Sequence, residues 1–288
     1  MSNLSPFIAE APQLAMPLVH AVAPGILAAD TITKLPPDAS GQVVVSGSHG
    51  GRYPGYLAAK AGLRAVILND AGVGKDAAGI GALAYLDALG IAAAAVSHES
   101  CRIGDTEDMI ARGRISASND AAAQAGVRPQ MACLEAAVLL TGAPHIRATD
   151  APEVGEGRSE IGDGALRRIV LVDSAAMVAP ADAGAIVVTG SHGGLVGGDP
   201  AMALRTDAFA AVFNDAGIGI EEAGIGRLAA LERRGFAAFT VSAASARIGE
   251  ARSSFADGVI SRLNESAARL GAAAGMRARD VLLAWAKG

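Results

Sequence analysis

Aromatic side chains and an excess of positive charge are both missing from this sequence. The 288 residues include 6 Phe, 3 Tyr and 1 Trp, and 24 Lys and Arg stand against 29 Asp and Glu, which gives a formal net charge of −5. So few rings leave little surface for stacking on bases, and a net negative chain has no electrostatic attraction for nucleic-acid phosphates. We therefore expect no nucleic-acid partner.

Long apolar runs, a disulfide framework and a basic leader are also absent. The mean hydropathy is +0.35, but Ala and Gly inflate it, and no stretch reaches the roughly 20 apolar residues that a membrane span needs. Two cysteines are too few for a framework, and Cys133 lies in an apolar helical stretch typical of a core thiol. Residues 1–30 contain no basic n-region. We expect a cytoplasmic homo-oligomer that has no membrane partner.

Strong catalytic and cofactor signatures are missing too. The sequence has no Gly-Lys-Ser/Thr phosphate loop, no G-x-G-x-x-G after a first strand, no G-x-S-x-G and no H-E-x-x-H. We therefore predict no cofactor and no metal. One alternative stays open, because a His and an Asp from each half would together supply four metal ligands.

The sequence does contain an internal duplication. VVVSGSHGG at 43–51 recurs as IVVTGSHGG at 186–194, AVILNDAGVG at 65–74 recurs as AVFNDAGIG at 211–219, and SHESCRIGD at 97–105 recurs as SAASARIGE at 242–250. A period this long indicates duplicated domains or pseudo-symmetric halves. We predict an N-terminal extension at 1–29, repeat one at 30–140, a linker or flap with the leading strand of repeat two at 141–172, and repeat two at 173–288.

Each repeat has the pattern of an α/β unit. Short β-branched or small apolar runs such as VVVS, AVIL and IAAAAV are typical of strands buried on both faces, and helical segments such as 77–90 separate them. A later helix is predicted at 115–126, with Ser116 as its cap and Gly126 as its stop. The expected fold is two tandem pseudo-symmetric α/β repeats, with mostly parallel sheets and helices on both faces.

The polar motifs all follow predicted strands. In sheets of this kind, ligands bind beyond the carboxyl ends of the strands, so we expect these motifs to converge at one edge of each repeat. In GSHGG the glycines let the backbone approach an anion, and the histidine is suited to proton transfer. In NDAG the carboxylate of Asp70 is predicted to orient His49, although Asn-Asp after a strand also makes a good turn.

The segment that contains Arg102 and its copy with Arg247 offers an anion site, or a structural arginine paired with a nearby acid. Repeat one carries more reactive groups, because His98 and Cys101 are replaced by alanines in repeat two. The predicted catalytic residues are His49, Asp70, Ser48, His98, Cys101, His192 and Asp215. The predicted substrate-binding residues are Gly50, Gly51, Asn69, Ser97, Ser100, Arg102, Ser191, Gly193, Gly194, Asn214, Ser242, Ser245 and Arg247.

Three functions are compatible with these motifs. The first, which we favour from the sequence, is a hydrolase that cleaves a C–N bond, in an amide or cyclic amide, of a small anionic or carboxylate metabolite by His/Asp acid–base chemistry. The second is an isomerase or lyase in which both repeats act on one substrate across a pseudo-two-fold axis. The third is a non-catalytic protein that binds an anion. Geometry discriminates the first two, since a cleft shared by both GSHGG loops favours the second.

Overall fold

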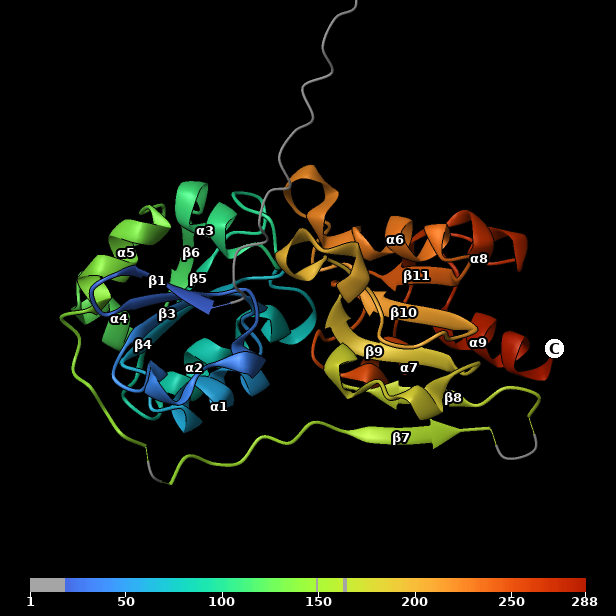
Figure 1. Ribbon diagram of the computed structural model, residues 1–288, viewed down its shortest axis with the longest axis horizontal. Helices are drawn as coiled ribbons and strands as arrows, with labels where there is room; N and C mark the ends of the chain where they lie inside the picture. The colour runs from blue at the N-terminus through green and yellow to red at the C-terminus, as the bar shows by residue number, and fades with distance from the viewer. Residues whose placement is uncertain (1–18, 149, 163–164) are drawn as a thin grey trace, which may run out of the picture.

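The computed structural model describes residues 19–148, 150–162 and 165–288, and these residues form two similar halves (Figure 1). Each half contains a six-stranded sheet whose strands lie side by side in chain order. The first sheet comprises β1 (Val19–Ala23), β2 (Ile26–Ala29), β3 (Val43–His49), β4 (Ala65–Asn69), β5 (Ala92–Val96) and β6 (Ile115–Ser118). The second comprises β7 (Arg158–Ile161), β8 (Ile169–Val172), β9 (Ile186–His192), β10 (Ala210–Asn214), β11 (Ala237–Val241) and β12 (Ile260–Leu263).

The four central strands of each sheet are parallel, and the two edge strands are antiparallel to their neighbours. The fold class predicted from the sequence is therefore confirmed. The antiparallel edges were not predicted, because β1, β6, β7 and β12 lack the continuous apolar runs of the central strands. β1 and β2 extend the first sheet unit back to Val19, and β7 extends the second back to Arg158.

Helices cover both faces of each sheet. In the first half, α1 (Arg52–Lys60) and α2 (Gly81–Asp87) pack on one face, and α3 (Thr106–Arg112), α4 (Asp120–Gln124) and α5 (Cys133–Leu140) pack on the other. In the second half, α6 (Arg227–Arg233) and short 3₁₀ turns cover one face, and α7 (Ala251–Ala256), α8 (Glu265–Arg269) and α9 (Ala278–Lys287) cover the other. Consecutive strand residues such as Val43 and Val44 therefore enter opposite cores, and both are fully buried.

One predicted helix is partly wrong. Residues 115–118 form the edge strand β6, and the helix that follows begins only at Asp120. Its cap is Asn119, whose side chain accepts from the backbone N–H of Ala122, so Ser116 is not the cap. The strand β6 has the sequence ISAS, in which apolar and polar residues alternate over only four positions. This pattern is too short to predict a strand when it is followed directly by an alanine run that favours a helix.

The segment that joins the halves packs on the first of them. It runs from α5 along one side of the molecule to β7 (Figure 1). The Tyr85 hydroxyl donates to the Pro152 carbonyl at 2.8 Å, and Ala151 and Val154 pack against the core beneath α1 and α2. Residues 150–157 are thereby held beside the junction of the halves. No helix among the described residues is long and apolar enough to cross a membrane.

A bulge shapes the end of the third strand in each sheet. Val45 pairs with Ile67 and His49 pairs with Asn69, so β3 holds two more residues than β4 over this stretch, and β9 repeats the irregularity beside β10. Bulges bend a strand and redirect its side chains. Here the bulge lies in the Gly-Ser-His segment, and it places Ser48 and His49 at the junction of the two halves.

Candidate functional site

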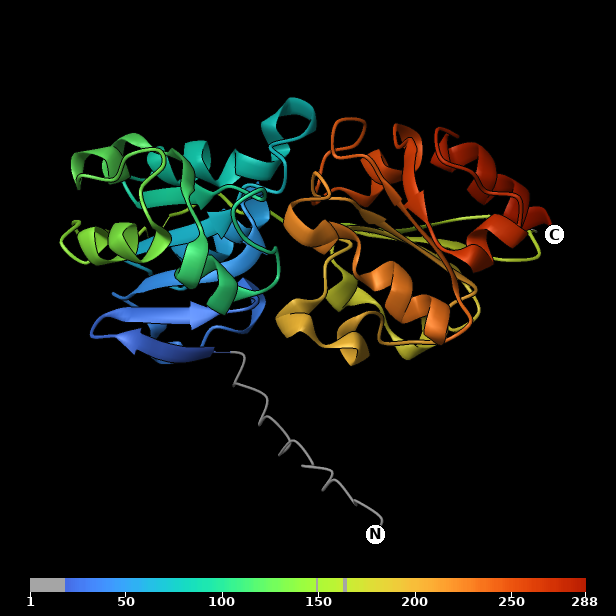
Figure 2. The same cartoon turned by 90° about the horizontal axis from the view of Figure 1, so that it is seen from above.

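The two NDAG loops meet where the halves join. A Cβ atom on Gly72 would lie 2.7 Å from the Gly217 Cα, and one on Gly217 would lie 2.8 Å from the Gly72 Cα. On either side of this crossing, the N–H of Lys75 donates to the Ala243 carbonyl at 2.8 Å and the N–H of Ile220 donates to the His98 carbonyl at 2.9 Å. The NDAG motif is thus a pseudo-symmetric contact between the halves, which lie side by side in Figure 2.

The predicted pairing of Asp70 with His49 is wrong. Oδ1 of Asp70 lies 2.8 Å from Nδ1 of His98, and it also accepts from the backbone N–H groups of His98 and Gly72. Asp215 accepts from the corresponding backbone groups, Gly217 and Ala243. Both carboxylates therefore hold the left-handed loops that follow them, because these loops leave N–H groups without a ladder partner.

The Asp70–His98 pair makes stability depend on pH. The hydrogen bond that His98 donates to Asp70 raises the pKa of His98. Although burial alone would raise the pKa of Asp70, hydrogen bonds from His98 hold it below its usual value. The histidine's contribution is complete below its unfolded pKa of about 6.5 and is lost as pH rises through its folded pKa. The aspartate's contribution is present above its unfolded pKa of about 3.9 and is lost as pH falls through its folded pKa.

We expect His98→Ala to destabilise the protein by about 1–3 kcal/mol near pH 6 and by clearly less at high pH. Urea unfolding at both pH values measures this difference. Ser97→Ala is the matched control, because it removes a hydrogen bond to the Glu99 N–H in the same loop without removing a titrating group. An equal loss for His98→Ala at both pH values would show that its charge does not contribute.

Arg102 and Arg247 form structural ion pairs, which was the alternative to the predicted anion site. Arg102 contacts Asp105 within its own half and Glu221 of the other half, the latter at 2.8 Å. Arg247 repeats this with Glu250 and with Asp76, again at 2.8 Å across the junction. Neither arginine lines the cleft described below.

The serines and asparagines of the motifs also form the loops. Ser100 donates to the Ser97 carbonyl and Ser245 to the Ser242 carbonyl, each at 2.8 Å. Asn69 and Asn214 each accept at 2.9 Å from the N–H two residues ahead. The Cys101 thiol is fully buried, and burial raises its pKa to about 12, so it is not a thiolate at neutral pH.

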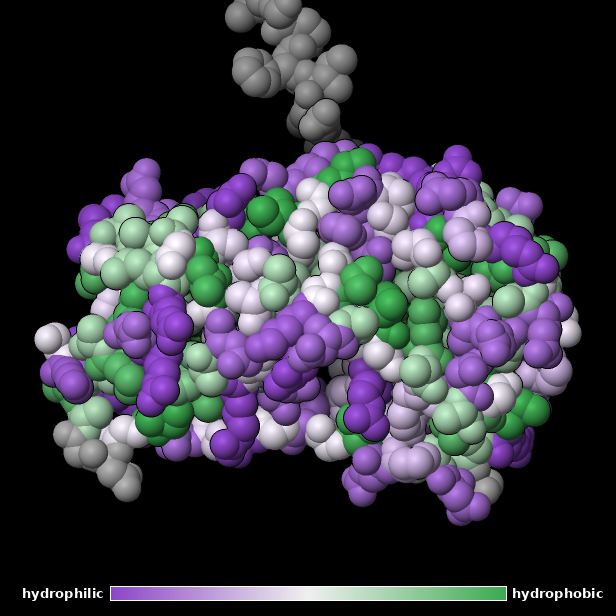
Figure 3. Space-filling model, turned by 180° about the vertical axis from the view of Figure 1, so that it is seen from behind, coloured by the Kyte–Doolittle hydropathy of each residue, from purple (hydrophilic) through white to green (hydrophobic). Residues whose placement is uncertain are grey.

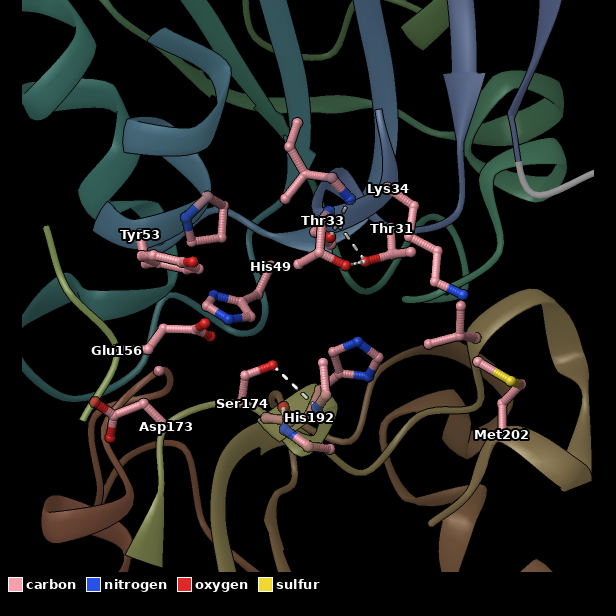
Figure 4. Close-up of a pocket in the computed structure, with 18 of the residues that line it drawn as sticks. Thr31, Thr33, Lys34, His49, Tyr53, Glu156, Asp173, Ser174, His192 and Met202 are labelled. Carbon is pink, nitrogen blue, oxygen red and sulfur yellow. Dashed lines mark hydrogen bonds between the residues drawn. The ribbon is translucent and has the colours of Figure 1, made fainter. Parts of the chain in front are cut away.

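A cleft with a volume of about 120 Å³ lies between the halves, and both GSHGG loops line it. It contains Ser48 and His49 from the first half and Ser191 and His192 from the second. The two histidines approach it from opposite sides (Figure 4). From behind, the surface is hollowed at the junction of the halves, and polar and apolar side chains are interspersed around it (Figure 3). Of the polar motifs at the strand ends, the two GSHGG loops thus line one shared cleft.

His49 is held as a neutral hydrogen-bond donor. Its Nδ1 accepts from the Gly51 N–H at 3.1 Å, so the neutral ring carries its proton on Nε2. Burial lowers the pKa of His49 to about 4, which keeps the ring uncharged at neutral pH. The folded-back imidazole also explains the second glycine, because a Cβ at Gly51 would lie 2.8 Å from the ring.

His192 is the more deeply buried of the two, with 6% of its surface exposed. Burial lowers its pKa well below the usual value, and the charge of Arg227 lowers it further. Among the described residues, its Nδ1 has no hydrogen bond of normal geometry, although the backbone of Gly194 lies next to it. Each imidazole abuts a glycine of the other half, His49 at Gly249 and His192 at Gly104.

The glycine N–H groups do not form the predicted anion nest. Gly50 donates to the Asn69 carbonyl at 2.7 Å and Gly193 donates to the Asn214 carbonyl at 2.8 Å, and the N–H of Gly51 is used by His49. The serine hydroxyls of the loops lie closer to the cleft. Ser48 accepts from the Ile32 N–H at 3.0 Å, and Ser191 accepts from the Ala175 N–H at 2.9 Å, which leaves each hydroxyl proton free to turn toward a ligand.

A carboxylate that was not predicted enters the cleft from the joining segment. Glu156 is partly buried near Tyr53 and Ser174, whose hydroxyls favour its charged form. Burial raises the pKa of Glu156, and burial together with Glu156 raises the pKa of Tyr53 to about 12. In Figure 4, Glu156, Tyr53 and His49 lie together on one side of the cleft, opposite Lys34 and Met202.

A buried arginine is the other unpredicted group. Arg227 begins α6 and lines the cleft with only 4% of its surface exposed. A signal for it exists in the sequence, since GIGALAYL at 79–86 aligns with GIGRLAAL at 224–231 and places Arg227 where repeat one has Ala82. No comparable signal marks Glu156, because the segment 141–157 has no copy in repeat one.

The described residues include no group of three or more His, Cys, Asp and Glu placed to hold a metal ion. The four-ligand arrangement considered from the sequence does not form, because Asp70 and Asp215 are engaged by their own loops. Comparisons with protein-family models, curated proteins and solved structures find no match. The chemistry of the cleft therefore rests on its own geometry.

Proposed function

We propose that this protein is an acid–base enzyme, an isomerase or lyase, that moves a proton on a small carboxylate metabolite in the shared cleft. The observation that carries the proposal is that both GSHGG loops face one cleft, where two uncharged histidines lie with the partly buried carboxylate of Glu156. Among the functions compatible with the sequence, this arrangement favours the one in which both repeats act on one substrate.

The groups fit proton abstraction next to a carbonyl. Glu156 takes a proton from the carbon, the electron pair moves onto the carbonyl oxygen, and the N–H of His49 donates a hydrogen bond to the oxyanion. A neutral imidazole suits this role because it stabilises the charge without protonating it early. Return of the proton to a different carbon or face gives an isomer, and loss of a leaving group from the neighbouring carbon gives a lyase product.

The other two functions have less support. A hydrolase that uses a protein nucleophile needs an activated side chain, but the Cys101 thiol is buried outside the cleft and no described base hydrogen-bonds to Ser48 or Ser191. A pure anion binder gains nothing from Glu156, whose charge opposes the ligand.

The test is proton exchange in deuterium oxide. Pyruvate has a carboxylate, a carbonyl and acidic C–H bonds, so we expect the protein to catalyse loss of its methyl proton signal in NMR spectra. His49→Gln should slow this exchange about 10²–10³-fold, the usual effect of removing one oxyanion donor. His145→Gln is the control, because His145 hydrogen-bonds the Gly62 carbonyl outside the cleft.

His192→Gln tests whether the cleft works as one site. From the sequence alone, His192 is expected to matter clearly less than His49, but the shared cleft makes a comparable loss the expected result. Pyruvate that binds without any exchange would contradict the proposed chemistry. If His49→Gln and His192→Gln both exchange protons at the wild-type rate, the GSHGG loops have only a structural role.

A further inference from the structure

We infer that Arg227 is the receptor for the substrate's carboxylate, and that it fixes the substrate in a single orientation within a cleft whose two sides are otherwise alike. The inference rests on the proposed function in taking this cleft as the reaction site. It goes beyond that function by specifying the side of the cleft that binds the carboxylate and the residue that selects for this group.

The guanidinium of Arg227 has acceptors but no counter-ion among the described residues. Nε donates to the Gly194 carbonyl at 3.0 Å, and Nη1 donates to the carbonyls of Met202 and Ala203. Its face lies 5.0 Å from the ring centroid of Phe213. Burial lowers the pKa of Arg227 to about 10, so the group still carries its charge at neutral pH.

One end of the guanidinium is left for a ligand. Nη2 makes no hydrogen bond to any residue that the structure describes, and the side chain lines the cleft. A buried cation without a counter-charge is costly, and a carboxylate supplies both the charge and the acceptor. Because Nε and Nη1 are already engaged, Nη2 offers one anchoring contact, which suits a carboxylate oxygen better than the several acceptor oxygens of a phosphate.

The buried cation lies on one side of the cleft. Ala82 occupies the equivalent place in the first half, and among the described residues Arg227 is the only buried Lys or Arg. The exposed side chains of Lys34 and Arg205 also line the cleft and add positive potential that attracts an anion. With its carboxylate at Arg227, a substrate presents its remaining carbons toward Glu156 and His49. The asymmetry therefore assigns the base and the oxyanion donor to the opposite side.

Calorimetric titration with pyruvate tests the inference, with acetone as the probe that lacks a carboxylate and inorganic phosphate as the alternative anion. We expect Arg227→Met to weaken pyruvate binding about 10- to 100-fold, the range for one charge-assisted hydrogen bond. Acetone should bind weakly to both proteins. Replacing a buried charge by a residue of similar volume is often tolerated, so the variant is expected to fold.

Arg234→Met is the matched control. Arg234 also donates to a backbone carbonyl, that of Leu204 at 2.8 Å, and stacks at 4.7 Å on Phe236, but it does not line the cleft. Its substitution should leave pyruvate binding unchanged. If Arg227→Met fails to fold, Arg227→Lys replaces it, and the lysine variant should also bind pyruvate more weakly because an ammonium cannot reach the carbonyls and the ligand together.

The outcomes separate this inference from the proposed function. Pyruvate binding that depends on Arg227, without proton exchange, supports the receptor and contradicts the enzyme. Exchange and binding that are unaffected by Arg227→Met overturn the receptor and leave the enzyme. Phosphate that binds more tightly than pyruvate at Arg227 overturns the assignment of a carboxylate.

Discussion

Glu156→Gln should reduce the rate of proton exchange about 10²–10⁴-fold, the usual cost of removing a general base. The substitution keeps the size of the side chain beside Tyr53 and Ser174, but it replaces the basic carboxylate by an amide that does not take up the proton. Because burial raises the pKa of Glu156, the carboxylate is a stronger base than an exposed one. In the wild-type protein, the rate should fall as pH decreases through that raised pKa.

Glu160→Gln is the control for this substitution. Glu160 lies on β7 and pairs with Arg158 and Arg168 outside the cleft. Its loss should leave the exchange rate and its pH profile unchanged. A Glu156→Gln variant that exchanges protons at the wild-type rate would place the base elsewhere, and His192 would then be the first residue to examine.

Gly72→Ala should destabilise the protein by about 3–5 kcal/mol. Single substitutions cause losses this large only through a few mechanisms, and backbone strain is one of them. Gly72 has a φ of +75° and its partner Gly217 a φ of +77°, and an added Cβ on Gly72 would lie 2.7 Å from the backbone of that partner. A left-handed conformation alone costs a residue with a side chain about 1–2 kcal/mol. The remainder comes from backbone atoms of both loops that have to move apart.

Gly184→Ala separates these two causes. Gly184 has a φ of +72° but no atom within 4 Å of an added Cβ, so its substitution measures the conformational cost alone. Chemical unfolding of both variants gives the difference. Equal losses would show that the NDAG loops tolerate separation and that the contact of the halves does not depend on this crossing.

The fold was predictable because its strands are short continuous apolar runs, and such runs have few structural solutions. Parallel order follows from the helices between them. The edge strands were not predictable in the same way, since Arg158–Ile161 contains three polar residues and a single apolar one. It forms a strand by pairing with β8, the next strand along the chain.

The site was predictable only in part, and the reason lies in what the duplication retains. His49 and His192 do line the cleft, but Asp70, Arg102 and their copies recur because both halves need them to hold one another. Arg227 and Glu156 occur once each, and a search for repeated motifs passes over them. Where two halves share a site, repetition marks the contact between the halves as readily as the chemistry.

The crossing of the NDAG loops has the form of an isologous interface, in which each surface contacts its own copy, as in a two-fold homodimer. Gly72 meets Gly217, and the pair of Arg102 with Glu221 is mirrored by the pair of Arg247 with Asp76. In a true homodimer every group at such an interface appears twice, so a buried cation such as Arg227 would have a copy on the other side. Joining the two copies in one chain removes that restriction, and the two sides of the cleft are unlike because Ala82 stands where the first half would repeat Arg227.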